Sequence, residues 1–136
     1  MIIINKRNLF FLISVWLLST LLSAQNVTIS TPQTQLLLSV PNGGTPEQLY
    51  YGSRTSDADI RSICETACRR NAYPVYGMGY PCETALSVRH ADGNLTLQMV
   101  VIGVKETRLT KENATLTVIE LKDKVYPFFV NICYKA

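Results

Sequence analysis

The hydrophobic positions of this chain follow two periodicities, and the first of them is helical. Between residues 56 and 71 the apolar side chains recur every three or four positions, as on one face of a helix, at Ile60, Ile63, Cys64, Ala67 and Cys68. Ser56 stands where an N-cap is expected, and Asp59 follows as its capping-box partner. The pattern therefore predicts one amphipathic helix over residues 56–71, which ends at Asn71.

The second periodicity is the alternation of apolar and polar residues that is typical of β-strands. It predicts four strands in the second half of the chain, over residues 83–90, 95–104, 115–122 and 125–134. The Asp-Gly pair between the first two strands indicates a hairpin, and a change of phase between Val118 and Ile119 predicts a β-bulge. Two shorter apolar runs near the start, at residues 26–30 and 35–40, predict edge strands.

The order of these elements predicts the fold class. Strands that follow one another through short turns usually pair with their neighbours. A run of turn-forming residues at 41–46 separates the N-terminal strands from the helix. We therefore expect an α+β fold in which one helix packs on a four-stranded antiparallel β-meander, with one or two short N-terminal strands and two disulfides.

The first 24 residues have the layout of a secretory signal peptide. Lys6 and Arg7 precede an apolar run at residues 9–22, and Ser23 and Ala24 supply small residues before Gln25. The alternative is an uncleaved membrane anchor, although the apolar stretch falls just short of the roughly 17–25 residues that span a bilayer. We expect a signal peptide over residues 1–24 and a single secreted domain over 25–136. That domain would be extracellular, or in the periplasm or at the cell surface of a bacterium.

The net charge of the predicted secreted domain excludes some classes of binding partner. The chain has 13 basic and 10 acidic residues, and 47% of its residues are hydrophobic. Without Lys6 and Arg7 the remainder carries 11 basic and 10 acidic residues, a net charge of +1. A near-neutral domain lacks the basic surface that nucleic acids or anionic membranes require, so we expect neither as a partner once the signal peptide is removed.

The four cysteines suggest disulfides. Cys64, Cys68, Cys82 and Cys133 all follow the signal peptide, and an even number in a small exported domain favours two disulfides. Three connectivities are possible, and Cys64–Cys133 with Cys68–Cys82 is favoured because both helix cysteines lie on one face and can each reach a neighbouring element. A structural zinc site needs more closely grouped ligands, so we expect no metal and no cofactor.

The titratable residues give no positioned catalytic set. His90 is the only histidine, and it lies at a strand end where we expect it to be solvated. Carboxylates that could flank a glycosidic bond are Asp57 with Asp59 and Glu65, or Glu106 with Glu112. Asp57 and Asp59 are better explained as charges at a helix N-terminus, and Glu106 and Glu112 flank a polar turn where we expect them to be solvated. We therefore predict a protein that is not an enzyme, and a small secreted hydrolase is the hypothesis with least support.

Residues 71–81 form the best candidate for binding, and we call them the Tyr loop. This loop and the segment before the helix hold five of the seven tyrosines, namely Tyr50, Tyr51, Tyr73, Tyr76 and Tyr80. Tyrosine offers apolar area and a hydroxyl at low entropic cost, and Gly77 and Gly79 allow close approach of a partner. Our leading hypothesis is a binding domain that uses the Tyr loop or a sheet face for an extracellular protein or glycan. The alternative, that these rings only cover the core, stays open.

Two further features bear on function. Asn-x-Ser/Thr sequons at Asn26, Asn94 and Asn113 predict glycosylation if the host modifies secreted proteins. The order of one helix and then a meander, with Gln98-Met99-Val100 on a strand, resembles the cystatins. That resemblance implies a secreted protease inhibitor as the second hypothesis. The sequence departs from the family's pattern because glycine arrives only at Gly103, and the only tryptophan lies in the signal peptide.

Overall fold

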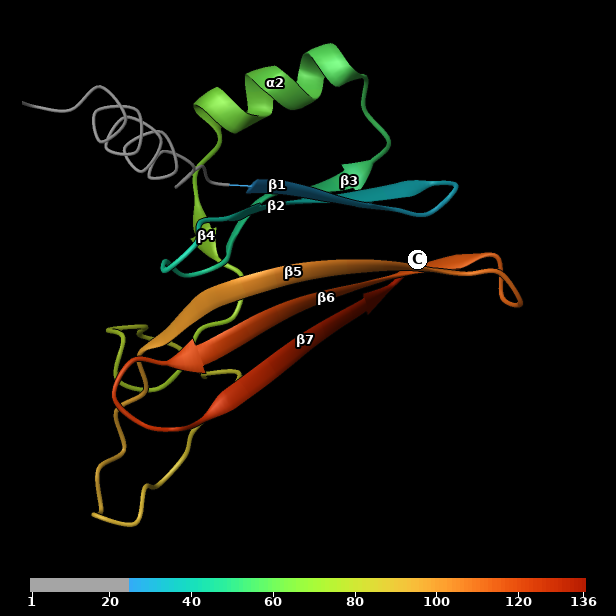
Figure 1. The fold of residues 1–136 in the computed structure, drawn as a ribbon. Helices are drawn as coiled ribbons and strands as arrows, with labels where there is room; N and C mark the ends of the chain where they lie inside the picture. The colour runs from blue at the N-terminus through green and yellow to red at the C-terminus, as the bar shows by residue number, and fades with distance from the viewer. Residues whose placement is uncertain (1–24) are drawn as a thin grey trace, which may run out of the picture.

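The computed structural model describes residues 25–136, so the predicted signal peptide lies outside the described residues. This part of the chain forms seven strands and one helix, labelled in Figure 1. In chain order they are β1 (Gln25–Ser30), β2 (Thr34–Val40), β3 (Glu47–Ser53), α2 (Asp57–Thr66), β4 (Arg70–Asn71), β5 (Met99–Leu109), β6 (Ala114–Asp123) and β7 (Phe129–Lys135). Between residues 25 and 136, no helix has the length and apolar character needed to cross a membrane.

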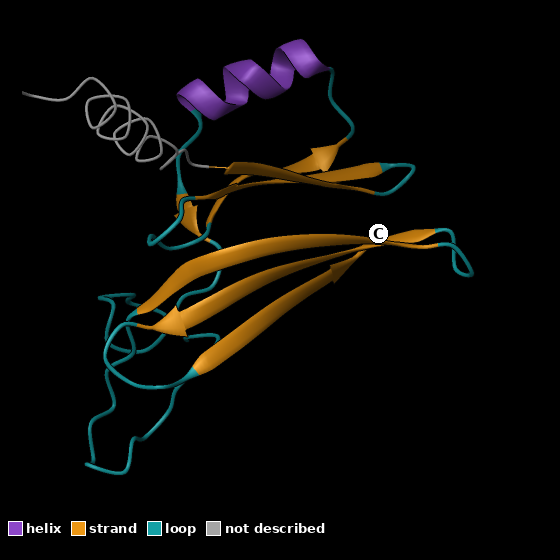
Figure 2. Cartoon of the chain, viewed as in Figure 1, coloured by secondary structure: helices purple, strands orange, loops and turns teal. Residues whose placement is uncertain are grey.

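The strands form two antiparallel sheets that lie one over the other (Figures 1 and 2). The first sheet has the order β1-β2-β3-β4, and the second has the order β5-β6-β7. A short parallel bridge joins the two layers, where the amide of Gly43 donates to the carbonyl of Val101 at 2.8 Å and the amide of Val101 donates to Gly44 at 2.8 Å. A long connection at residues 72–98 links the last strand of the first sheet to the first strand of the second sheet.

The hydrophobic core fills the space between the two sheets. Alternation along β1 and β2 places one set of aliphatic side chains on the inner face of the first sheet, and alternation along β5 and β6 does the same for the second. These residues are at most 2% exposed: Val27, Leu38, Val40, Val75, Leu97, Met99, Val101, Ile119 and Leu121. The architecture is therefore a β-sandwich with both inner faces contributing to one core.

The helix lies outside this sandwich. Figure 1 shows α2 on the side of the first sheet that faces away from the second sheet. Its N-terminus has the predicted capping box, because Ser56 accepts a hydrogen bond from the amide of Asp59 and the Asp59 carboxylate accepts one from the amide of Ser56. No residue of α2 is itself buried, but Ile63 lines one hollow together with Leu49 of β3, which is 8% exposed.

The helix ends earlier than predicted, at Thr66 rather than Asn71. Ala67 already has extended backbone angles, and the next residues turn back to pair with β3. Arg70 and Asn71 form β4, and Arg69 makes an ion pair with Glu47 at 2.8 Å. Pairing with the edge of β3 satisfies backbone groups that a longer helix would have used internally.

The predicted fold class is wrong. The domain is mostly β-sheet, in two layers, and not an α+β arrangement of one helix on a four-stranded meander. The N-terminal runs combine with β3, which the periodicity did not predict, into a sheet of their own. Residues 83–90 do alternate in exposure, yet they form no sheet strand because their backbone bonds to the irregular Tyr loop, as between Ala85 and Pro74 at 2.8 Å. The irregularity predicted within 115–122 lies instead on β5, between Val101 and Gly103.

The two predicted disulfides are also absent, and Cys64, Cys68, Cys82 and Cys133 are all free thiols. The prediction required the helix to pack on the strand that carries Cys133. Instead the first sheet lies between α2 and β7, so Cys64 and Cys133 are on opposite sides of it (Figure 1). Cys64 accepts a weak hydrogen bond from the side-chain amide of Asn26 at 3.3 Å, and Cys82 is exposed in the connection between the sheets.

Candidate functional site

The connection between the sheets exposes a group of large apolar side chains. Tyr76, Met78 and Tyr80 of the Tyr loop are 47%, 42% and 44% exposed, and Leu95 farther along the connection is 42% exposed. We call these four residues the apolar loop surface. Exposed apolar side chains indicate a surface that contacts another molecule where they lie together in one patch.

Backbone contacts hold this surface in place. The amide of Tyr76 donates to the carbonyl of Leu86 at 3.1 Å, and the carbonyl of Tyr76 accepts from the amide of Leu97 at 3.0 Å. Gly77 lies directly against Thr96, so close that a Cβ at position 77 would be 2.6 Å from the Thr96 Cγ2 atom. The loop is thus fixed to the strand-like segment behind it, which limits the conformational entropy that a partner would have to remove.

The five candidate tyrosines do not form one site. Tyr76 and Tyr80 are exposed on the loop, but Tyr73 is half-buried and packs against the core. Tyr50 and Tyr51 belong to β3 in the first sheet. The ring of Tyr50 lies over Gly52 and its hydroxyl donates to the carbonyl of Ser53 at 2.9 Å, which is a structural contact.

His90 is half-buried, and not solvated as predicted. Its ring stacks on Tyr126 with centroids 3.6 Å apart and planes at 9°, and it meets Phe128 edge-on at 6.3 Å. The Nε2 atom is buried and has no hydrogen-bond partner among the described residues. The contacts of the imidazole are therefore aromatic, and no nucleophile lies within hydrogen-bond distance of it, as a triad would require.

Beside this histidine, Tyr126 and Asp92 form a fixed donor–acceptor pair. The Tyr126 hydroxyl donates to Asp92 at 2.6 Å and accepts from the side-chain amide of Asn94 at 3.0 Å. The bond from Tyr126 lowers the pKa of Asp92, and the same bond raises the pKa of Tyr126. At neutral pH the carboxylate is ionised and the phenol is protonated, so the pair orders two turns rather than transferring a proton.

Asp123 orders the turn that carries Tyr126. Asp123 is 1% exposed. Its carboxylate accepts hydrogen bonds from the backbone amides of Gln98 at 2.7 Å, Val125 at 2.8 Å and Tyr126 at 2.9 Å. Burial by itself would raise the pKa of Asp123. The hydrogen bonds from the three backbone amides outweigh the effect of burial and hold the pKa below its usual value of 3.8. This buried carboxylate is therefore ionised and fully used by the fold.

The carboxylates that could have formed a glycosidase pair mostly have structural contacts. Asp59 belongs to the helix capping box, and Asp57 lies in the first turn of α2. Glu112 makes an ion pair with Lys135, and it lies in the hairpin turn while Glu106 lies on β5. Glu65 is exposed on the helix. Among residues 25–136, no three His, Cys, Asp or Glu side chains are grouped so that they could hold a metal ion.

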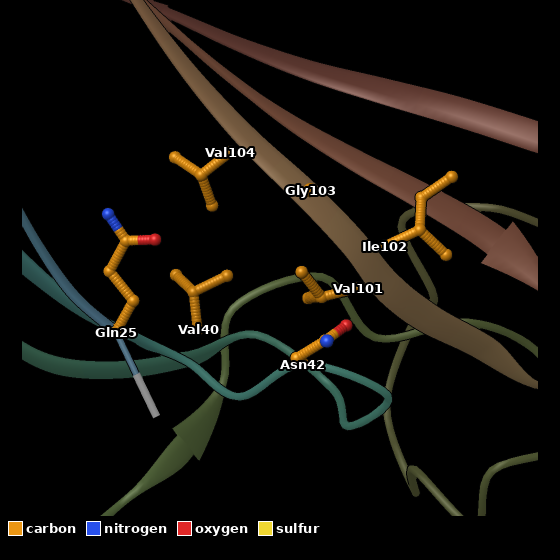
Figure 3. A pocket seen from close by; sticks show the side chains of 7 residues that line it. All are labelled: Gln25, Val40, Asn42, Val101, Ile102, Gly103 and Val104. Carbon is orange, nitrogen blue, oxygen red and sulfur yellow. The ribbon is translucent and has the colours of Figure 1, made fainter. Parts of the chain in front are cut away.

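A hollow of about 240 Å³ opens between the two sheets beside their backbone bridge (Figure 3). Val40, Val101 and Val104 point into the same space, and the side-chain amide of Gln25 extends toward Val104 from β1. Ile102, at the irregularity in β5, points away from it. The lining contains no ionisable side chain, so the hollow offers shape and one or two amides but no acid, base or nucleophile.

Two members of the apolar loop surface, Met78 and Leu95, are not among the binding residues predicted from the sequence. Met78 lies between Gly77 and Gly79 of the Tyr loop, and only the tertiary structure shows that its side chain is exposed. Of the three sequons, Asn26 is exposed on β1, Asn94 is bonded to Tyr126, and Asn113 lies in the β5–β6 turn. Their glycosylation stays a prediction.

Comparison with known proteins identifies relatives of this sandwich. The sequence profile of the glycosyl hydrolase family 36 N-terminal domain matches residues 44–136, more than half of the chain. No curated protein matches the chain. Two solved structures share the fold, the α-galactosidase from Lactobacillus brevis and the galactosidase domain of an α-galactosidase–sucrose kinase.

The match to these two structures is structural rather than close in sequence. The first has a TM-score of 0.69 and 15% identity over 83% of this chain. The second has a TM-score of 0.63 and 18% identity over 80% of this chain. The chain spans only 20% of the length of either structure, so the likeness covers one part of those enzymes.

Proposed function

Because the chain belongs to the glycosyl hydrolase family 36 N-terminal domain family, we propose that it is a non-catalytic domain that docks to other parts of an α-galactosidase-like enzyme. The family and the two similar structures, both of α-galactosidases, suggest the enzyme class. The chain itself supplies a β-sandwich with a fixed apolar surface at its long connection. We further propose, from the signal-peptide pattern of residues 1–24, that this domain works outside the cytoplasm.

The observation that carries the proposal is the apolar loop surface. Tyr76, Met78, Tyr80 and Leu95 are each more than two-fifths exposed, although the apolar part of each side chain would lower the free energy by leaving water. Met78 and Leu95 add apolar area without hydrogen-bonding groups, which suits a protein surface better than a hydroxyl-rich glycan. A surface of this kind is stabilised when another protein covers it.

The proposal that the domain is non-catalytic rests on its ionisable groups. Asp123, Asp59 and Glu112 are used in the fold, and the lone histidine is stacked between aromatic rings. The hollow between the sheets contains no titratable side chain. Hydrolysis of a glycosidic bond requires two positioned carboxyl groups, and the contacts of these three carboxylates favour a structural role over a catalytic one.

Co-expression tests the docking role directly. The chain is produced together with the catalytic region of a family 36 hydrolase from the same genome, and their co-purification is measured. We expect the wild-type chain to co-purify, and the triple variant Tyr76→Ser, Met78→Ser, Tyr80→Ser to lose most of this binding. Tyr51→Ser is the matched control, because Tyr51 is 68% exposed but lies on β3.

Two results would overturn this proposal. Unchanged co-purification of the triple variant, with folding verified by circular dichroism, would show that the apolar loop surface is not the docking surface. Sustained hydrolysis of an aryl α-galactoside by the purified chain alone would show that the domain is catalytic.

The protease-inhibitor hypothesis loses its basis. It depended on a four-stranded meander that follows the helix, and the chain instead has a three-stranded second sheet separated from α2 by the first sheet. Gln98 is not on a hairpin tip but donates its amide to the buried Asp123 beside the start of β5.

A further inference from the structure

The second sheet carries a small hollow at its β6–β7 turn that the docking role does not use. The hollow measures about 270 Å³ and is lined by Lys122, Lys124, Val125, Tyr126, Pro127 and Phe129. It lies at the end of β6 and the start of β7, whereas the apolar loop surface belongs to the connection between the sheets. We propose that this hollow binds one acidic sugar residue, a hexuronate, through its carboxylate and one face of its pyranose ring.

An exposed aromatic ring forms one side of the hollow. Phe129 is 59% exposed and Val125 is 69% exposed, so both present apolar area to water. Phe129 is the first residue of β7 and is paired with Lys122 across the sheet. The C–H face of a pyranose is the part of a sugar that an aromatic face can cover, which would remove this area from solvent.

Two lysines supply the charge. Lys122 places its Nζ over one face of the Phe129 ring, 5.8 Å from the centroid, which leaves the opposite face for a ligand, and Lys124 lies two residues farther along the chain. The three ion pairs found in residues 25–136 use Arg69, Lys105 and Lys135 as their cations, and neither lysine of the hollow takes part in one. Two ammonium groups without carboxylate partners beside an apolar ring favour an anion that also has an apolar face.

The turn that holds these groups is rigid. Asp123 accepts from the amides of Val125 and Tyr126, its own amide donates to Phe128 at 2.8 Å, and the amide of Lys124 donates to Gln98 at 3.1 Å. Asp123 is 1% exposed and its carboxylate is bonded to backbone amides, so it forms no ion pair with Lys122 or Lys124. Asp92, the other nearby acid, is bonded to the hydroxyl end of Tyr126.

The volume of the hollow and the net charge of the domain limit which class of ligand can bind there. The hollow is smaller than the roughly 300–1,000 Å³ of typical small-molecule sites, so it fits one sugar residue rather than a stretch of polymer. The near-neutral charge of the domain gives no extended basic track for a nucleic acid. A uronate at a chain end or branch of a polysaccharide has the required single charge and ring.

A pair of matched ligands tests this inference on the whole chain. Methyl α-galacturonide and methyl α-galactoside differ only in the carboxylate at C6, and each is titrated into ¹⁵N-labelled protein while amide shifts are recorded by NMR. We expect the galacturonide to shift the amides of residues 122–129, and the galactoside to cause much smaller shifts at equal concentration. Binding should weaken as NaCl rises from about 0.02 to about 0.5 M, because salt screens exposed charges.

Variants separate the ring from the charges. Phe129→Ala should abolish the amide shifts that the galacturonide causes. Phe129→Leu keeps apolar volume at this position but removes the aromatic ring, so it should stay folded and still bind the galacturonide poorly. Lys122→Gln and Lys124→Gln should each weaken binding by up to about fivefold, the effect of one exposed ion pair. Lys111→Gln, an exposed lysine in the β5–β6 turn, should change nothing.

Three outcomes would overturn the inference. Equal shifts with the galactoside would show that the carboxylate is not recognised, and equal shifts with sodium sulfate would show a general anion site. Full binding by Phe129→Ala would show that the ring takes no part. Each result is independent of the docking proposal, because the apolar loop surface is untouched in all of these variants.

Discussion

The contact between Gly77 and Thr96 gives a prediction whose size can be worked out from the structure. Gly77 and Gly79 both have positive φ, at +94° and +74°, so alanine at either position pays the backbone cost of a left-handed conformation, about 1–2 kcal/mol. Only position 77 is also crowded. A Cβ there would be 2.6 Å from Thr96 Cγ2 and 2.9 Å from Thr96 Cα, whereas position 79 has nothing within 4 Å.

The extra cost at position 77 is the cost of overpacking, about 1–3 kcal/mol. We therefore expect Gly79→Ala to lower the free energy of unfolding by about 1–2 kcal/mol and Gly77→Ala by about 2–5 kcal/mol. For a domain of this size each kcal/mol lowers the melting temperature by about 4 °C, so circular dichroism melts and urea titrations resolve the two variants.

A second substitution identifies the source of the cost. Thr96→Ser removes the Cγ2 methyl but keeps the Cα atom, so it should recover part, not all, of the stability lost in Gly77→Ala. If Gly77→Ala and Gly79→Ala differ by less than about 0.5 kcal/mol, the resolution of such comparisons, the packing of the loop against Thr96 is refuted.

Three other predictions follow from buried or free polar groups. Asp123→Asn should lower the free energy of unfolding by about 2–3 kcal/mol in urea titration, since one backbone amide then faces an NH₂ group; Glu83→Gln, an exposed acid, is the control. Because the folded-state pKa of Asp123 lies below its usual 3.8, its contribution should be complete above pH 3.8 and disappear as the pH falls further; a melting temperature that rises in acid would contradict this. Thiol titration of the denatured, unreduced chain should find four free thiols, and two or fewer would contradict the observed cysteine arrangement.

The local elements could be read from the sequence far better than their arrangement. The helix start at Ser56 and Asp59 was predicted because a capping box is made by residues three apart. The layering was not, because alternation states which residues share a face but not which strand lies beside them. Residues 83–90 show this limit, since their exposure alternates as predicted while their backbone bonds to the Tyr loop.

The candidate site divides in the same way. Tyr76 and Tyr80 could be found from composition, since a loop rich in tyrosine and glycine is typical of recognition surfaces. Tyr50 and Tyr73 have the same residue type, and only the tertiary structure shows that one lies over Gly52 and the other packs against the core. The sequence gives no signal for the hollow at Phe129, because residue 129 falls within the strand predicted over residues 125–134 and periodicity does not show what lies beside a strand.

The position of α2 outside the sandwich has a consequence for local unfolding of the domain. A helix with no buried residue of its own has fewer contacts to lose on opening than a strand of the sandwich has, although its opening would also uncover Leu49 of β3. We therefore expect α2 to open and close while the two sheets remain folded, with its amides exchanging with deuterium much faster than those of β6. The domain would then consist of a slowly exchanging sandwich and a quickly exchanging outer layer, and proteases would first cleave the chain between β3 and β4.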